Sequence, residues 1–160
     1  MALVTVGIAD FKVSNNPEDT LVSYSLGSCI GLAVYDPVAG VGGLLHYMLP
    51  DSSINQEKAE KNPAMFANRG IPLLFKSCFK LGADKNRMIV KVAGGSRIMG
   101  GAGAFDIGKR NYAVLRKIFS KNRVAIAGED IGGSYNRTLY LQIADGRTSL
   151  KIAKKGVVEL

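Results

Sequence analysis

The segment Leu26-Gly27-Ser28-Cys29-Ile30-Gly31 separates two apolar stretches of the chain and organises the fold around it. Residues 21–26 and 30–35 are predicted strands, because each is a short run rich in branched and aromatic side chains. A turn sequence containing Asp, Pro and Gly follows, and residues 41–49 return as a third apolar strand. We therefore expect a β-hairpin over 30–49 that begins directly after the cysteine.

The single histidine of the chain, His46, lies on the returning strand, 17 positions after Cys29. A thiol attacks poorly while it is protonated, and free cysteine has a pKa of about 8.5. An imidazole within hydrogen-bond reach can take the thiol proton and later return it to a leaving amine. Small residues around Cys29 would let a substrate carbonyl approach backbone N–H groups that stabilise an oxyanion. Cys29 and His46 are therefore the minimum parts of a thiol hydrolase.

Both residues also have ordinary structural explanations. A free cysteine usually behaves as a small buried hydrophobe, and a lone histidine in an apolar stretch is more often a satisfied core residue than a base. Gly27 interrupts a strand beside the cysteine, and Gly42-Gly43 offers close backbone approach beside His46, which favours catalysis. Residue chemistry alone leaves catalysis and packing both open. Cys78, on a helical apolar stripe, is expected to be a core residue.

The composition indicates one globular domain over 1–160, with 47% hydrophobic residues and no low-complexity tract. No run approaches the ~18 apolar residues of a membrane span, so membrane insertion is not expected. The N-terminal sequence lacks the features of a secretory signal, and the two cysteines are far apart, which predicts a cytoplasmic protein without a disulfide. One histidine and two distant cysteines cannot build a metal site, and no cofactor is predicted.

The formal charge of +8 is unevenly distributed. Twelve of the 21 basic residues fall between Lys76 and Arg123, where Asp84 and Asp106 are the acidic residues. Such a stretch indicates an acidic partner or substrate, or simply solvated lysines on two amphipathic helices. Nucleic acid is the usual partner of a basic patch, but the sequence shows no zinc ligands, aromatic binding sheet or heptads. Nucleic-acid binding is therefore not predicted.

The remaining patterns predict an α+β fold in which mixed or antiparallel sheets are layered with two main helices, as in an α/β/β/α-type sandwich. Apolar spacing predicts helices over 64–81, with a kink or restart at Pro72, and over 111–119. Residues 51–62 are polar and predict a loop. The other predicted strands cover residues 2–8, 11–13, 87–93, 124–128, 137–144 and 148–154, the last two joined by an Asp-Gly turn.

A set of short motifs occurs along the chain between about Val6 and Asp145. These motifs are Leu26-Gly27-Ser28-Cys29, Tyr35-Asp36-Pro37, Gly42-Gly43, His46-Tyr47-Met48-Leu49-Pro50, Lys91-Val92-Ala93-Gly94-Gly95, Ile107-Gly108-Lys109-Arg110-Asn111, and Gly128-Glu129-Asp130-Ile131-Gly132-Gly133 followed by Arg137. Together, and in this order, they resemble the CheD family of chemoreceptor glutamine deamidases, and the piece at 46–50 is rarely met elsewhere.

The resemblance implies a protein-glutamine glutaminase, an amidohydrolase that converts selected glutamines of chemotaxis receptors to glutamate and ammonia. By position, Cys29 is its thiol nucleophile and His46 its base. The third catalytic residue of the family, usually threonine, falls six positions before the cysteine and is Ser23 here. Serine keeps the hydroxyl that would orient the imidazole but lacks the methyl that fixes its rotamer. The predicted substrate and oxyanion region comprises backbone near the nucleophile, at Gly27, Ser28, Gly94 and Gly95.

Two other functions remain as alternatives. CheD-like proteins also pair with the chemotaxis phosphatase CheC, so the chain could be a regulatory module that docks receptors or CheC with weak or no hydrolysis. A nucleic-acid-binding domain would instead show an affinity that falls steeply with salt and survives loss of Cys29.

Overall fold

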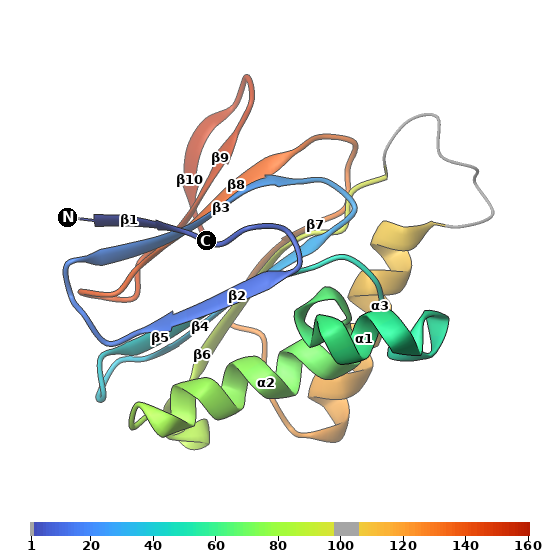
Figure 1. Ribbon diagram of the computed structural model, residues 1–160. Coiled ribbons are helices and arrows are strands. Elements are labelled where there is room, and N and C mark those ends of the chain that lie inside the picture. The colour runs from blue at the N-terminus through green and yellow to red at the C-terminus, as the bar shows by residue number, and fades with distance from the viewer. Residues whose placement is uncertain (1, 98–105) are drawn as a thin grey trace.

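The computed structural model describes residues 2–97 and 106–160, which form two five-stranded sheets and a layer of helices (Figure 1). The strands are β1 (Ala2–Thr5), β2 (Asp10–Ser14), β3 (Asp19–Leu26), β4 (Ile30–Asp36), β5 (Val41–Tyr47), β6 (Ile89–Gly94), β7 (Gly128–Ile131), β8 (Arg137–Gln142), β9 (Thr148–Ile152) and β10 (Gly156–Glu159). The α-helices are α1 (Gln56–Lys61), α2 (Ala67–Lys80) and α3 (Ile107–Lys121), and the short 3₁₀ helices are η1 (Ser52–Ile54), η2 (Pro63–Met65) and η3 (Lys85–Arg87).

Both sheets are mixed. Sheet A has the strand order β1-β3-β8-β9-β10, and sheet B has the order β2-β5-β4-β6-β7. The pairs β1–β3 and β6–β7 are parallel, and the other neighbouring strands are antiparallel. The predicted hairpin is confirmed as β4–β5 in sheet B, and the Asp-Gly turn joins β8 to β9 in sheet A.

Two separate apolar layers hold the three structural layers together. One lies between the sheets and includes Leu21, Leu44 and Leu139, all fully buried. The other lies between sheet B and the helices and includes Leu74 of α2 and Leu115 of α3. Sheet B is therefore covered on both faces, which is why every residue of β4 and β5 is buried.

The predicted α+β domain with mixed sheets and two main helices is confirmed, but its layers follow the order α/β/β rather than the predicted α/β/β/α. Both α2 and α3 cover the same face of sheet B, below the sheets in Figure 1. In β8 of sheet A, buried residues take every second position. This alternation explains why none of the described helices covers the outer face of sheet A. Such a strand buries one face and leaves the other toward solvent, so sheet A needs no helix of its own.

The helix predictions were right in kind and partly wrong in position. Residues 51–62 were predicted to be a loop, but they contain η1 and α1, because Asn55 caps α1 by accepting from the N–H of Lys58. The expected break at Pro72 lies instead at Phe66, between η2 and α2. The strand predicted over 124–128 begins at Gly128 as β7, and β10 was not predicted.

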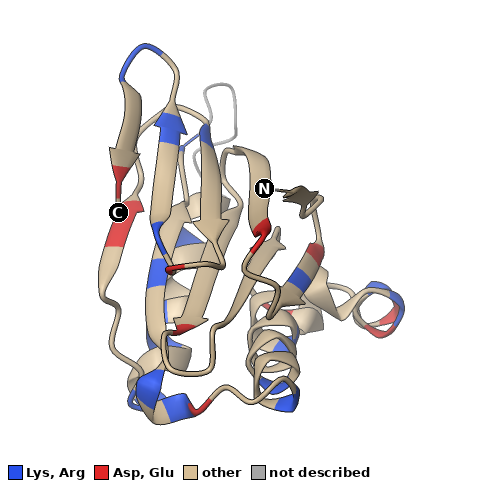
Figure 2. Ribbon diagram, turned by 90° about the vertical axis from the view of Figure 1, so that its left-hand side faces the viewer, with Lys and Arg blue, Asp and Glu red and all other residues tan. Residues whose placement is uncertain are grey.

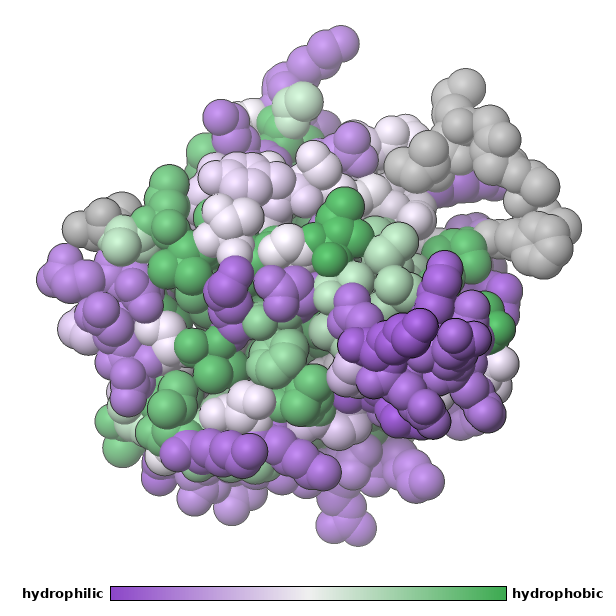
Figure 3. All heavy atoms as spheres, viewed as in Figure 1, coloured by the Kyte–Doolittle hydropathy of each residue, from purple (hydrophilic) through white to green (hydrophobic). Residues whose placement is uncertain are grey.

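Charge and hydropathy mark different parts of the surface. Figure 2 shows Lys and Arg gathered at the end of the molecule where α2 and α3 terminate. On the face seen in Figure 3, hydrophilic side chains cluster over α1 and apolar side chains lie toward the middle. Within the described residues, no helix has the length and apolar character that crossing a membrane requires.

Candidate active site

Cys29 lies in the turn that carries the chain from sheet A to sheet B, between β3 and β4. The end of β6 holds this turn, since the N–H of Gly95 donates to the Cys29 carbonyl (2.9 Å) and the N–H of Ser96 donates to the Gly27 carbonyl (2.9 Å). Gly94 has a φ of 117°, and a side chain there would collide with the Cys29 carbonyl oxygen. Glycine is therefore required at position 94 to bring this backbone against the cysteine.

His46 and Ser23 meet between the two sheets. His46 comes from β5 of sheet B and Ser23 from β3 of sheet A, and the Ser23 Oγ lies 2.7 Å from the His46 Nδ1. Both side chains are fully buried. A β-bulge follows Ser23, with Ser25 at a φ of 57°, and it lets Ser23 and Leu26 both face inward although they are three residues apart.

The hydrogen bonds at Ser23 fix the tautomer of the imidazole. The Ser23 hydroxyl has one hydrogen, and it donates that hydrogen to the carbonyl of Val6 (2.9 Å). The Ser23 oxygen must then accept from His46, so the Nδ1 of His46 carries the proton. The Nε2 therefore presents a lone pair. This nitrogen is buried and has no hydrogen-bond partner among the described residues.

Cys29 lies on the same side of sheet B as His46. Gly31 is directly opposite His46 in the β4–β5 ladder and faces Leu26 and Leu139 of sheet A. Cys29, in the bend two residues before Gly31, packs against the core between the sheets. No hydrogen bond joins Cys29 to His46 within the described residues. Cys29 lies just outside the β4–β5 ladder, whose end pair is Ile30 with Tyr47.

Burial sets the resting protonation of both groups. It raises the pKa of the Cys29 thiol above its ordinary value of 9.0, although the backbone N–H of the same residue opposes this by stabilising the thiolate. Burial also lowers the pKa of His46 to about 4. At neutral pH the site therefore holds a protonated thiol and a neutral imidazole whose free nitrogen can accept a proton.

The predicted oxyanion region divides into two kinds of residue. The N–H of Gly95 is occupied by the Cys29 carbonyl, and Gly94 supplies close backbone approach, so these two hold the turn. The N–H of Cys29 lies beside its own sulfur. Within residues 2–97 and 106–160, the N–H of Ser28 donates to no other group. The free donors next to the thiol are therefore the amides of Ser28 and Cys29, while Gly27 contributes the carbonyl that accepts from Ser96.

Asn111 was quoted as part of a motif but was not predicted to belong to the site. From α3 its side-chain amide donates to the carbonyls of Ser28 (3.0 Å) and Met48 (2.9 Å). Ser28 precedes β4, beside Cys29, and Met48 follows β5, two positions after His46. The fully buried Asn111 amide thus joins the cysteine turn to the histidine strand where the β4–β5 hydrogen bonds stop.

Arg137 was also missed, and it is a fully buried cation. Its guanidinium donates to the Ser96 hydroxyl (2.8 Å), the Asp130 carboxylate (2.8 Å) and the Gly132 carbonyl (2.7 Å). It also lies over the ring of Tyr135, 4.4 Å from its centroid. Arg137 therefore fixes the backbone after β6 that supports the Cys29 turn. The available signal was an arginine at a buried position of a strictly alternating strand.

Two glycines expected beside His46 serve packing. A side chain at Gly42 would strike Ile143 of sheet A, and one at Gly43 would meet Leu74 and Cys78 of α2. Their absence of side chains lets sheet A and α2 approach the two faces of β5. Cys78 is fully buried in the helix layer, and burial raises its pKa to about 12, so its prediction as a core residue is confirmed.

The described residues contain no group of three His, Cys, Asp or Glu side chains placed to ligate a metal ion. The site is therefore built from one thiol, one imidazole, one hydroxyl and backbone amides. This donor set suits acyl transfer to sulfur.

Comparison with known proteins identifies the family of the chain. The family model described as CheD chemotactic sensory transduction matches residues 48–152. The chain belongs to the CheD family. A protein from Syntrophus aciditrophicus (strain SB), named probable chemoreceptor glutamine deamidase CheD 1, is 56% identical over 151 residues, covering 94% of each chain.

Further CheD relatives come from other bacteria. The probable chemoreceptor glutamine deamidase CheD of Solibacter usitatus (strain Ellin6076) is 49% identical, covering 94% of this chain and 89% of its own length. A crystal structure of Neisseria meningitidis protein NMB0706, of family DUF152, superimposes with a TM-score of 0.43 at 11% identity, over 82% of this chain and 62% of that one. That likeness is too distant to bear on function.

Proposed function

We propose that residues 1–160 form one CheD-like deamidase domain that hydrolyses glutamine side chains of chemotaxis receptors, using Cys29 as nucleophile and releasing ammonia. The observation that carries this proposal is the unpartnered Nε2 of His46, which Ser23 holds as a proton acceptor on the face of sheet B that also carries Cys29. A buried nitrogen without a hydrogen-bond partner lowers the stability of the fold by about 1–3 kcal/mol. Such a loss is expected where the nitrogen is needed to accept a proton during the reaction. The names of the relatives supply the substrate class.

The reaction begins with transfer of the Cys29 proton to the Nε2 of His46 as sulfur adds to the amide carbon. The two pKa values oppose this transfer in the resting protein, because burial favours the neutral form of each group. Opposite charges within about 4–6 Å stabilise each other, so thiolate and imidazolium form together when the two side chains close on the substrate. Apo structures often hold such pairs apart.

The amide oxygen gains negative charge as the tetrahedral intermediate forms. The N–H groups of Ser28 and Cys29 are the free donors that can stabilise it. The imidazolium then gives its proton to the amide nitrogen, the carbon–nitrogen bond breaks, and ammonia leaves a thioester on Cys29. Water, deprotonated by His46, attacks the thioester and releases glutamate and the free thiol.

Ser23 orients this base, and its hydroxyl can do so because it is itself anchored on the Val6 carbonyl. A cytoplasmic location and pairing with a CheC-type phosphatase belong to the same proposal and rest on the family resemblance. A module that docks receptors without hydrolysing them remains the second candidate, since the third catalytic position holds serine where the family usually has threonine.

The test is incubation of the purified protein with a chemoreceptor cytoplasmic fragment. We expect glutamine-containing peptides of the fragment to gain about one dalton, with ammonia released in equal amount. Cys29→Ala is the inactive control, and Cys78→Ala is its matched control at the other thiol. Binding of the fragment without any mass gain would replace the enzyme with the docking module.

A further inference from the structure

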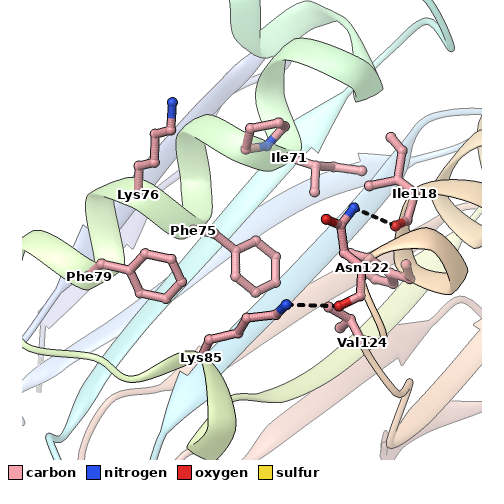
Figure 4. A pocket seen from close by; sticks show the side chains of 10 residues that line it. Ile71, Phe75, Lys76, Phe79, Lys85, Ile118, Asn122 and Val124 are labelled. Carbon is pink, nitrogen blue, oxygen red and sulfur yellow. Dashed lines mark hydrogen bonds between the residues drawn. The ribbon is translucent and has the colours of Figure 1, made fainter.

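A second surface of the molecule has the features of a binding site and takes no part in the proposed reaction. It is a hollow of about 240 Å³ between α2 and α3 (Figure 4). Its floor is apolar and aromatic. The ring of Phe75 packs against Phe79 (6.2 Å between centroids) and Phe119 (6.1 Å), with Ile71 and Ile118 on the two helices above them. We call this hollow the α2–α3 groove.

The apolar floor is open to solvent. The side chain of Phe79 lines the groove and is 39% exposed, which is a large exposure for a phenylalanine. Phe75 and Ile118 are half-buried, and Figure 4 shows both rings of α2 directed toward α3. Exposed apolar patches that are rimmed by polar residues commonly mark interaction sites, whereas single exposed apolar residues do not.

The rim of the groove is basic. Lys76 and Lys85 line it, and Lys80 and Lys121 end the two helices beside it. Within the described residues, Lys76, Lys80 and Lys121 make no ion pair. Asp84 is the one carboxylate within residues 67–87 and 107–127, and it already faces Arg87. The rim therefore presents positive charge that nothing in the described part of the chain neutralises.

We propose that the α2–α3 groove docks an acidic amphipathic helix of a partner protein. A groove between two helices accepts a third helix, whose apolar ridge at positions i, i+3 or i+4 and i+7 enters between them. Acidic residues flanking that ridge would meet the lysines of the rim. The apolar floor demands side chains such as Leu or Phe, which a nucleic-acid backbone cannot supply.

The charge distribution also argues against a second copy of this chain as the occupant. Two copies joined through this groove would bring two rims of like charge together, on a chain that already carries a formal charge of +8. An acidic partner reverses the sign of this interaction. It would also bind faster at low salt, because opposite charges steer association.

The groove and the thiol lie at opposite ends of β4. Cys29 precedes the strand, and its last residue, Asp36, accepts from the N–H of Asp84 (2.8 Å) and pairs with Arg87 (2.9 Å), next to Lys85. Seven residues of strand span roughly 20 Å. The groove also belongs to the helix layer, whereas Cys29 packs against the layer between the sheets. A helix in the groove therefore leaves the thiol site open, and this proposal does not depend on the proposed function.

The experiment uses a fluorescent amphipathic peptide of about 15 residues, roughly four turns, with Leu and Phe on one face and Glu on the flanks. Anisotropy would measure its affinity for the full chain. A peptide of the same apolar face with Lys in place of Glu is the ligand control. We expect saturable binding of the acidic peptide alone, and slower amide exchange over α2 and α3 when it is bound.

Matched variants separate docking in the groove from general attraction to a basic protein. Lys76→Glu should weaken binding about tenfold, and Lys151→Glu, which changes the net charge equally on the exposed side of sheet A, should change it less than twofold. Phe79→Ser should weaken binding at least about tenfold, whereas the exposed Val38→Ser should not.

Equal losses for Lys76→Glu and Lys151→Glu would overturn the proposal, as would no binding of the acidic peptide. A concentration-dependent dimer in sedimentation that Phe79→Ser removes would assign the groove to a second copy instead. Stronger competition by a single-stranded oligonucleotide than by the acidic peptide would assign it to nucleic acid. Each of these results contradicts an acidic helical partner.

Discussion

The two cysteines of this chain lie in different layers of the same fold and differ in everything that surrounds them. Cys78 lies on α2 in the layer between the helices and sheet B, among Leu74, Phe119 and the backbone of Gly43. Cys29 lies at the edge of the layer between the sheets, in a turn where the Gly27 and Cys29 carbonyls accept hydrogen bonds and the N–H of Cys29 lies beside its own sulfur. Burial raises the pKa of both thiols.

Since burial is common to both thiols, their other surroundings lead us to expect different roles for them. Cys78 is fully buried in the apolar layer against the helices, and burial alone accounts for its raised pKa. Cys29 keeps partial exposure and shares a face with an imidazole nitrogen that has no other partner. The layer between the sheets is lined by apolar side chains, and Ser23 and His46 place a hydroxyl and an imidazole within it. The following predictions test this contrast, beginning with the largest effect.

Removing each thiol in turn should give opposite results. Cys29→Ala should abolish deamidation and leave the fold intact, because the nucleophile is lost from a partly exposed turn. Cys29→Ser should also be nearly inactive, since an alkoxide is far harder to form than a thiolate. Cys78→Ala should keep activity and lower the free energy of unfolding by about 1 kcal/mol. Ammonia release and urea unfolding measure the two effects, and full activity of Cys29→Ala would remove the thiol mechanism.

Removing the base should have the next largest effect. His46→Ala should lower kcat by about 10²–10⁴-fold, the contribution expected of a positioned general base. The same variant should slow alkylation of Cys29 by iodoacetamide at pH 7, because no group then takes the thiol proton. Alkylation of unfolded protein provides the reference rate. An unchanged rate of both reactions would show that the thiol acts without His46.

We expect Asn111 to affect the rate by holding the cysteine turn beside the histidine strand, without taking part in the reaction itself. Asn111→Asp replaces a donor amide with a carboxylate that faces two carbonyl oxygens, so the cysteine turn and the histidine strand should move apart. We expect kcat to fall about tenfold or more with a smaller change in KM. Protonation of the new carboxyl at low pH should restore one of the two hydrogen bonds and part of the rate. A pH profile parallel to that of the wild type would count against this role.

Position 23 should give a smaller and graded effect. Ser23→Thr should preserve or modestly raise activity, because a β-branched side chain fixes the rotamer that presents its hydroxyl to His46. Ser23→Ala should lower kcat by less than the loss of Cys29 or His46, since the reacting groups remain and only their orientation is lost. Rates for Thr, Ser and Ala on one receptor fragment provide the comparison. If alanine equals serine, the hydroxyl seen at 2.7 Å has no catalytic part.

The pH dependence of stability should report the buried imidazole. His46 has a pKa of about 4 in the folded protein against an ordinary value of 6.5, so the unfolded state binds its proton first as the pH falls. The stability that neutral His46 contributes is complete above pH 6.5 and decreases toward pH 4, by up to about 3 kcal/mol. Urea unfolding at pH 7 and 4.5 should show a smaller loss for His46→Gln than for the wild type.

Much of the site was predictable because its parts are close in sequence. Cys29 directly precedes the hairpin that carries His46, and antiparallel pairing of neighbouring strands follows from two apolar runs joined by a tight turn. The motif comparison added Ser23, which the structure does bring to His46. Asn111 and Arg137 escaped prediction because their partners are backbone carbonyls of segments distant in sequence, and no periodicity encodes such contacts.

The sequence by itself determined which residues alternate between apolar and polar, and therefore the strands, the two main helices and the β4–β5 hairpin. It also determined the one histidine and the two thiols available for chemistry. The tertiary structure decided that β3 and β4 enter different sheets, which places the Ser23 hydroxyl of one sheet against the imidazole of the other. The packing of α2 on sheet B also decided that the Cys78 thiol is fully buried, whereas Cys29 keeps partial exposure. These outcomes depend on long-range packing of whole layers, and local sequence patterns cannot specify them because each strand is apolar enough to join either sheet.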